Sequence, residues 1–176
     1  MLEPLAVDGG LIEELAAPLR KMGHECIPCS EKLDAKTASK LDADVFIIAN
    51  SPLSGEVIRA NPKLKFISVA FTGIDHVDLK ACEEKGICVK NAQGYCTDAV
   101  AELTFAHILA LLRNILPCDG AVRRSETKNG LVGHELRGKT LGIVGTGAIG
   151  IRVAQIAGVF GCRVLGYSRS QRQEAL

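Results

Sequence analysis

The sequence lacks an excess of charge of either sign. Its 21 Lys and Arg residues almost balance 20 Asp and Glu residues, which leaves a formal net charge of +1. Binding to nucleic acid or to an anionic membrane normally depends on a surplus of basic residues. The composition therefore indicates neither as a partner. A hydrophobic content of 47% and a charged content of 23% are instead typical of a globular protein.

Long hydrophobic runs and an export signal are also missing. The longest apolar stretch, Ala99 to Leu112, is interrupted by Glu102 and His107 and is too short to span a bilayer. The first residues, Met1 to Leu5, show neither the basic region nor the apolar core of a secretory signal. We therefore expect a cytoplasmic protein that does not enter a membrane.

The seven cysteines form no complete zinc motif. Cys26 and Cys29 make a single C-x-x-C, but the sequence has no second C-x-x-C and no H-x-x-x-H to supply further ligands. The other five cysteines are scattered through apolar segments, as expected of buried reduced thiols. We predict no metal site, and a metal or redox role of the Cys26–Cys29 pair is the alternative.

Glycine, by contrast, is abundant and forms the most informative motif. The apolar run Leu141 to Val144 predicts a buried strand, and G-x-G-x-x-G follows at Gly145, Gly147 and Gly150 before a helical pattern. Strand, glycine turn and helix together are typical of a dinucleotide site. The first glycine permits the tight turn, the second lets the backbone approach a pyrophosphate, and the third lets helix and strand pack closely. The amino-terminal amides of the helix would then bind the phosphates.

The residues after the next predicted strand, Cys162 to Tyr167, bear on the choice of nucleotide. NAD sites usually place Asp or Glu at the end of this strand to bind the ribose 2′-hydroxyl. Here the sequence has Ser168 and Arg169, with Arg172 close by. Arginine and hydroxyl groups can hold a 2′-phosphate by charge-assisted hydrogen bonds. We therefore favour NADP over NAD as the cofactor, and a solvated basic turn that tolerates either is the alternative.

The first half of the chain alternates short apolar strands with helical segments, which predicts a parallel sheet with helices on both faces. Asp78 is the expected amino-terminal cap of one helix. Strands are expected at Leu2–Val7, Glu25–Pro28, Val45–Ala49, Phe66–Ala70 and Ile87–Val89, and helices at Leu11–Met22, Asp34–Leu41, Ser54–Ala60 and Leu79–Lys85.

A longer helix is predicted over residues 98–115, with Thr97 as its cap and Pro117 as its break. Apolar residues cover nearly its whole circumference, so we expect it to be buried on all sides, between domains or between subunits. His107 would then be a hydrogen-bonded core residue. We predict a homodimer formed through this helix.

Three blocks of the sequence resemble the D-isomer-specific 2-hydroxyacid dehydrogenases. The first runs from Lys65 to Leu79 and contains Thr72-Gly73-Ile74-Asp75-His76-Val77-Asp78; the second runs from Val89 to Leu103; and the third is the glycine fingerprint opened by Leu136 to Thr140. The resemblance implies an α/β protein. A flavodoxin-like substrate domain, here incomplete, would occupy residues 1–96, and the first β-α-β unit of a Rossmann dinucleotide-binding domain would occupy residues 97–176, with its fingerprint at 141–150.

The resemblance also implies roles for individual residues. Phe71, Thr72 and Gly73 would bind the substrate, a small 2-hydroxy or 2-oxo acid, chiefly through backbone amides. The cofactor would contact the following residues: Thr72, Thr97, Gly145, Gly147, Ala148, Ile149, Gly150, Ser168 and Arg169. The sequence departs from the family pattern at Phe71, where a glycine is usual, at Gln93, where a proline is usual, and at Ser168, where an aspartate is usual.

The acid–base chemistry of this family uses an arginine, a histidine and a carboxylate at positions that the resemblance would place beyond Leu176. Of the histidines present, only His76 lies near the expected substrate loop, and its neighbours Asp75 and Asp78 are better explained as turn and cap residues. We therefore expect an amino-terminal part of a hydride-transferring oxidoreductase that is inactive by itself. The alternative is a non-catalytic nucleotide-sensing or corepressor-like protein of the same fold.

Overall fold

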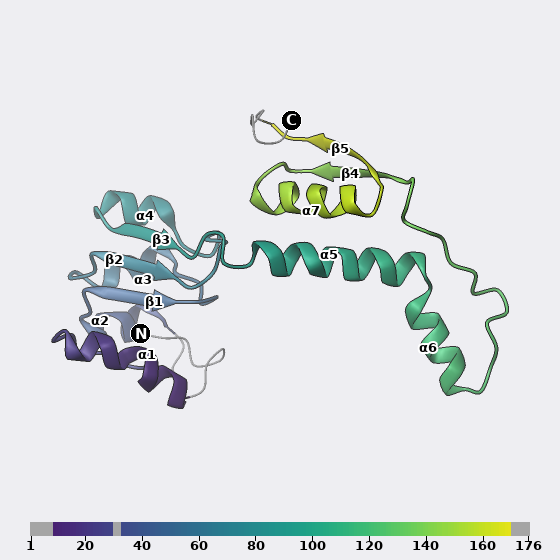
Figure 1. The fold of residues 1–176 in the computed structure, drawn as a ribbon. Coiled ribbons are helices and arrows are strands. Elements are labelled where there is room, and N and C mark those ends of the chain that lie inside the picture. Colours follow the sequence, from purple (N-terminus) through teal and green to yellow (C-terminus); the bar gives the residue numbers. More distant parts are fainter. Residues whose placement is uncertain (1–8, 30–32, 170–176) are drawn as a thin grey trace. The chain divides into compact units, whose positions relative to one another are not determined.

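The computed structural model describes residues 9–29 and 33–169, so the strand predicted at Leu2–Val7 lies outside the described residues. The chain divides into two compact units, Met1–Tyr95 and Cys96–Leu176, and each is described by itself. Both are built from parallel strands connected by helices, so the predicted α/β fold is confirmed (Figure 1).

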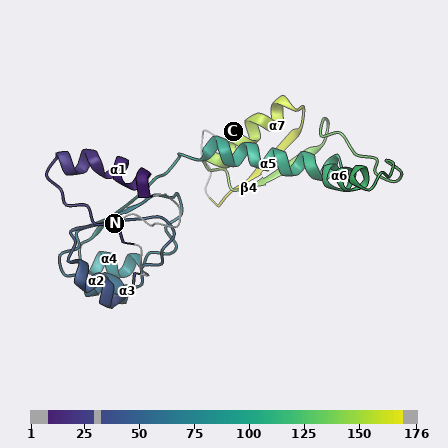
Figure 2. The same cartoon turned by 90° about the horizontal axis from the view of Figure 1, so that it is seen from below.

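The first unit contains a three-stranded parallel sheet with the order β1-β2-β3. The strands are β1 (Val45–Ile48), β2 (Phe66–Val69) and β3 (Cys88–Asn91), and the helices are α1 (Gly9–Lys21), α2 (Ala35–Leu41), α3 (Gly55–Ala60) and α4 (Leu79–Glu84). Figure 2 shows α1 on one side of the sheet and α2, α3 and α4 on the other. Alternate strand residues form the core of this unit, because Phe46, Ile48, Ile67 and Val69 are all buried.

Local signals explain where these helices begin and end. The Asp78 carboxylate accepts a hydrogen bond from the Ala81 amide at 3.0 Å, which confirms Asp78 as the cap of α4. Gly86, with a φ of +67°, ends the same helix in a left-handed conformation that favours glycine.

The strand predicted at Glu25–Pro28 is wrong. The segment pairs with no described strand and instead lies beside α1, where the Arg20 guanidinium donates a hydrogen bond to the Cys26 carbonyl at 3.3 Å. Pro28 has no backbone N–H to donate to a sheet. Cys26 and Ile27 line a hollow of about 500 Å³ beside Ile47.

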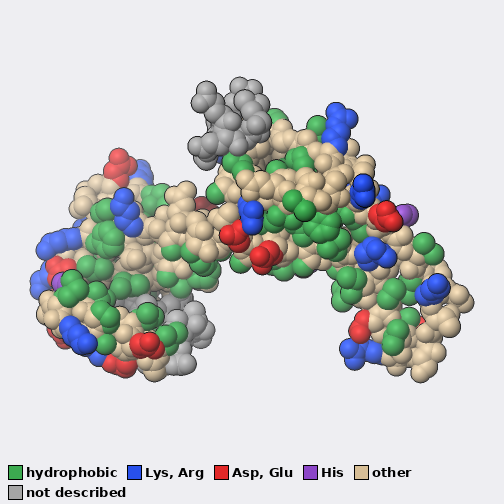
Figure 3. All heavy atoms as spheres, viewed as in Figure 1, with side chains coloured by type: hydrophobic (Ala, Val, Ile, Leu, Met, Phe, Trp, Pro, Cys, Tyr) green, Lys and Arg blue, Asp and Glu red, His purple; other side chains and the backbone are tan. Residues whose placement is uncertain are grey.

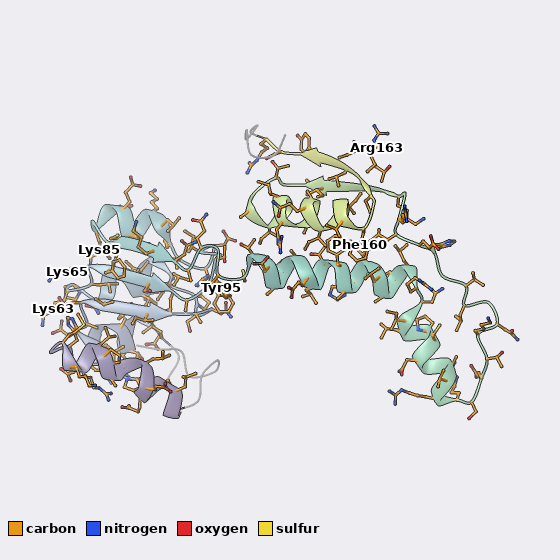
Figure 4. The ribbon with its side chains drawn as sticks, in the orientation of Figure 1. Lys63, Lys65, Lys85, Tyr95, Phe160 and Arg163 are labelled. Carbon is orange, nitrogen blue, oxygen red and sulfur yellow. The ribbon has the colours of Figure 1, made fainter. Side chains whose placement is uncertain are left out.

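The second unit contains a two-stranded parallel sheet and three helices. Its elements are α5 (Thr97–Leu112), α6 (Ile115–Arg123), β4 (Thr140–Val144), α7 (Ala148–Val159) and β5 (Arg163–Tyr167). The core lies where α5 packs against α7, and there the rings of Phe105 and Phe160 stack with centroids 5.3 Å apart (Figure 4). Arg152 of α7 donates a hydrogen bond to Asp98 of α5 at 2.6 Å, which joins the amino-terminal turns of the two helices.

The boundaries of α5 differ from those predicted. The helix begins at Thr97 itself, and Cys96 occupies the cap position without a side-chain bond that caps the helix. It ends at Leu112, since Asn114 adopts a left-handed conformation with a φ of +52°. Pro117 does not break the helix, because it lies in the first turn of α6, where a missing N–H leaves no intrahelical bond unmade.

Within this unit α5 is not buried on all sides, and its burial between domains or subunits stays a prediction. Only Ala101 and Phe105 are buried, whereas Leu103 is 55% and Leu111 is 80% exposed. His107 is exposed as well, and so is not a core residue. One side of α5 packs on α7, and the remaining apolar side chains reach the surface of this unit (Figure 3).

No single helix in the described ranges is long and apolar enough to cross a membrane. The pair formed by α5 and α6, bent by 59°, meets the length and composition criteria only when the two helices are taken together.

Candidate functional site

The turn between β4 and α7 has the backbone conformation that the glycine motif predicted. Gly145 has a φ of +102°, and its amide donates a hydrogen bond to the Tyr167 carbonyl at 2.7 Å. A residue with a side chain rarely adopts this conformation. Gly147 then occupies the cap position of α7 in an extended conformation. The chain therefore turns directly from the carboxyl end of a strand into the amino terminus of a 12-residue helix.

The other two glycines of the motif have different surroundings. A Cβ at Gly150 would lie 2.0 Å from the Gly145 carbonyl oxygen and 3.3 Å from Cγ2 of Ile143, so only glycine lets α7 pack this closely on β4. A Cβ at Gly147 would meet nothing within 4 Å. Open space at Gly147 and a tight contact at Gly150 are what a backbone cradle for a pyrophosphate requires. The residues present therefore fit the phosphates of a dinucleotide.

Helix α7 supplies the electrostatics of this cradle. The first turn of a helix has backbone N–H groups without intrahelical partners and a partial positive charge. Here that turn contains Ala148, Ile149 and Gly150. Thr97 lies in the first turn of α5, which the Asp98–Arg152 bond joins to α7. The second unit thus brings most of the predicted cofactor residues to one helix terminus and one sheet edge.

Ser168 and Arg169 follow β5 directly, at the same carboxyl edge of the sheet as the glycine turn. Ser168 is half-buried, and Arg169 is exposed and forms no ion pair with another described residue. No carboxylate lies between Arg163 and Arg169. At the expected ribose position this edge of the sheet therefore has no described acidic side chain, and Arg169 places one positive charge there.

The predicted substrate residues follow β2 in the first unit. Phe71 and Thr72 are half-buried and Gly73 is exposed. The ring of Phe71 packs edge-on against Tyr95, with centroids 6.4 Å apart (Figure 4). The Ala92 amide donates to the Phe71 carbonyl at 3.1 Å, and the Asn91 side-chain amide donates to the Thr72 carbonyl at 2.6 Å. The segment after β3 therefore holds the loop after β2.

Asn91 is a residue that sequence reasoning did not assign to the site. The available signal was its place as a polar residue at the carboxyl end of β3. The carboxyl ends of neighbouring parallel strands lie at one sheet edge, so a polar side chain there is within reach of the adjacent loop.

The described histidines form no acid–base pair. His24, His107 and His134 are exposed, and the buried Nε2 atom of His76 has no hydrogen-bond partner. No group of three or more His, Cys, Asp or Glu side chains is arranged to hold a metal ion, as far as the structure describes the chain. The pKa of the Cys82 thiol in α4 is raised, chiefly by burial. The described loops thus offer backbone donors for binding.

Comparisons with known proteins give the family. Residues 5–175 match the model of the D-isomer specific 2-hydroxyacid dehydrogenase catalytic domain. Similar curated proteins include a glyoxylate reductase of Thermococcus litoralis, 39% identical over 77% of this chain and 43% of that protein. A hydroxyphenylpyruvate reductase of Plectranthus scutellarioides is 43% identical over 70% of this chain and 40% of that protein.

Solved structures agree with the sequence comparisons. The D-lactate dehydrogenase of Aquifex aeolicus, in complex with NAD and lactic acid, aligns with a TM-score of 0.84 and 29% identity, over 96% of this chain and 51% of that one. The chain thus spans about half the length of its solved relative and less than half of the curated relatives above. The suspected resemblance is confirmed: this chain belongs to the D-isomer specific 2-hydroxyacid dehydrogenase family.

Proposed function

We propose that this chain supplies the dinucleotide-binding turn and the substrate loop of an oxidoreductase that interconverts small D-2-hydroxy acids and 2-oxo acids. The observation that carries the proposal is the β4–α7 turn, with its open Gly147 and its tightly packed Gly150. A bound nicotinamide dinucleotide would supply the hydride chemistry. The chain's own contribution is to bind the pyrophosphate at the first turn of α7 and the substrate carboxylate at the Thr72–Gly73 backbone.

The cofactor that we propose is NADP. Ser168 and Arg169 stand at the end of β5, where an aspartate or glutamate would repel a 2′-phosphate. Charge-assisted hydrogen bonds between arginine and phosphate are worth about 1.5–3 kcal/mol, so we expect NADPH to bind about tenfold or more tightly than NADH. Competitive titration of the two reduced nucleotides tests this. Tighter binding of NADH would refute it.

The substrate class follows from the family and from named relatives that reduce glyoxylate and hydroxyphenylpyruvate. We propose that this 176-residue chain has no turnover by itself, because its described histidines pair with no described carboxylate. Oxidation of NADPH in the presence of glyoxylate, pyruvate or hydroxypyruvate tests the proposal. Turnover at enzyme-like rates would contradict it. The family assignment does not favour the alternative of a nucleotide-sensing, corepressor-like protein.

We further propose that the chain forms a homodimer that buries the exposed side of α5. Leu103 and Leu111 of α5 are 55% and 80% exposed. Large apolar side chains exposed together on one helix are a common feature of subunit interfaces. Light scattering tests this, and a stable monomer would contradict it.

A further inference from the structure

The ends of β2 and β3 are held together by more hydrogen bonds than the sheet itself provides. Asn91, the last residue of β3, pairs in register with Val69, the last residue of β2. Beyond this pair, the Ala92 amide lies 3.1 Å from both the Val69 and the Phe71 carbonyl oxygens. The Asn91 side-chain amide then reaches one residue further and donates to the Thr72 carbonyl at 2.6 Å.

These bonds fix the orientation of a peptide plane. The peptide unit is planar and trans, so the carbonyl of one residue and the N–H of the next point in opposite directions. The Thr72 carbonyl points toward Asn91. The Gly73 N–H must therefore point away from Asn91 and from the end of β3.

This N–H is left without a described acceptor. Gly73 is exposed, and its N–H donates to no other described residue. An oriented backbone donor without an acceptor of its own can bind an anion, because it needs no rearrangement when the anion arrives.

We propose that Asn91 is a positioning residue, whose side-chain amide turns the Thr72–Gly73 peptide so that the Gly73 N–H donates to the carboxylate of the 2-oxo acid. The inference rests on the proposed function, which places the substrate carboxylate at this loop. Asn91 itself does not touch the substrate. Its contribution is to hold the peptide in one orientation, so that binding does not have to order it.

The test follows the Gly73 amide by two-dimensional NMR while oxamate, an unreactive analogue of pyruvate, is titrated into the full 176-residue chain. Asn91→Ala removes the donor without adding charge, and Asn91→Gln keeps an amide on a longer side chain. Asn129→Ala is the matched control, because Asn129 is exposed in the second unit and its side chain bonds to no described residue. Thermal melting of each variant shows whether it folds.

In the wild type the Gly73 resonance should move in a saturable way. The dissociation constant of Asn91→Ala for oxamate should be about tenfold higher, because a change of that size corresponds to the loss of about one charge-assisted hydrogen bond. Its melting temperature should stay near that of the wild type. The dissociation constant of Asn91→Gln should lie between those of the wild type and Asn91→Ala, and Asn129→Ala should bind like the wild type.

Two results would contradict the inference, and they are distinguishable. Equal affinity of the wild type and Asn91→Ala, with Gly73 responding in both, would leave the substrate loop in place and remove the role of Asn91. A Gly73 resonance that never responds in the wild type would instead overturn the substrate loop, and the role of Asn91 with it.

Discussion

Replacing Gly150 with alanine should destabilise the second unit, although alanine is the better helix former. The new Cβ would lie 2.0 Å from the Gly145 carbonyl oxygen and 3.1 Å from its carbonyl carbon. Relief would require either α7 to move away from β4 or the turn to move. Gly145 is itself held by its hydrogen bond to the Tyr167 carbonyl at the end of β5.

The magnitude follows from two opposing effects. Overpacking of this kind costs about 1–3 kcal/mol, and a collision with a backbone carbonyl places the cost near the upper limit. Alanine recovers about 1 kcal/mol relative to glycine inside a helix. We therefore expect the unfolding free energy of the second unit to fall by about 2 kcal/mol.

Gly158→Ala in the same helix is the matched control. A Cβ at Gly158 would meet nothing within 4 Å, so only the gain in helix propensity remains. This variant should be more stable than the wild type by about 0.5–1 kcal/mol. Urea unfolding followed by circular dichroism, together with hydrogen exchange of the β4 and α7 amides, measures both changes. If Gly150→Ala were as stable as the wild type, the close packing of α7 on β4 would be refuted.

Three further substitutions test other parts of the account. Ser168→Asp should reverse the preference from NADPH to NADH in competitive titration, because a carboxylate repels the 2′-phosphate and accepts from the 2′-hydroxyl; an unchanged preference would separate Ser168 from the ribose site. Leu111→Lys should convert the proposed dimer to a monomer in light scattering, since Leu111 is 80% exposed on α5; a persistent dimer would place the interface elsewhere. Asp34 accepts a hydrogen bond from the Thr37 amide, which holds the pKa of its carboxyl below the usual value, so the stability that it gives is lost as pH falls through that lowered pKa. Asp34→Asn keeps a capping side chain but cannot lose a charge. Between about pH 5 and pH 2 its unfolding free energy, measured by urea titration at each pH, should fall less steeply than that of the wild type. Equal slopes would exclude a contribution of the Asp34 charge to stability.

The elements that sequence predicted well are those with local chemical signals. Asp78 and Gly86 bracket α4, and both act through hydrogen bonds or dihedral angles within a few residues of the helix. The glycine turn is similar, because a positive φ at Gly145 and a close contact at Gly150 are requirements that only glycine meets. Such signals depend little on the rest of the fold.

The predictions that failed concerned features decided by tertiary contacts. The segment Glu25–Pro28 has an apolar strand-like pattern, but it is bonded to Arg20 of α1 instead of to a neighbouring strand. The sequence predicts the end of α5 at Ile115, just before the helix breaker Pro117. The helix ends instead at Leu112, before Asn114, whose side-chain amide donates to the Val132 carbonyl at 3.2 Å. Arg20 lies 6 residues from Cys26 and Val132 lies 18 residues from Asn114, and hydrophobic patterning does not reveal either contact.

The residues of the candidate site divide in the same way. Gly145, Gly147 and Gly150 were predicted from their spacing, because the turn needs those residue types in that order. Asn91 was not assigned, since its partner is the carbonyl of Thr72 in another loop, 19 positions away. Backbone carbonyls have no sequence signature, so a side chain that positions one is seen only in the folded chain.

The most direct test of the central claim is an NMR titration of the amides around the β4–α7 turn with NADPH. If the pyrophosphate lies at the first turn of α7, the largest shifts should fall on Gly147, Ala148 and Ile149. Gly147→Ala, whose methyl group would enter the open space in front of the turn, should bind much more weakly while keeping the fold. Saturable NADPH binding that leaves these amides unmoved, or that Gly147→Ala does not weaken, would contradict the account.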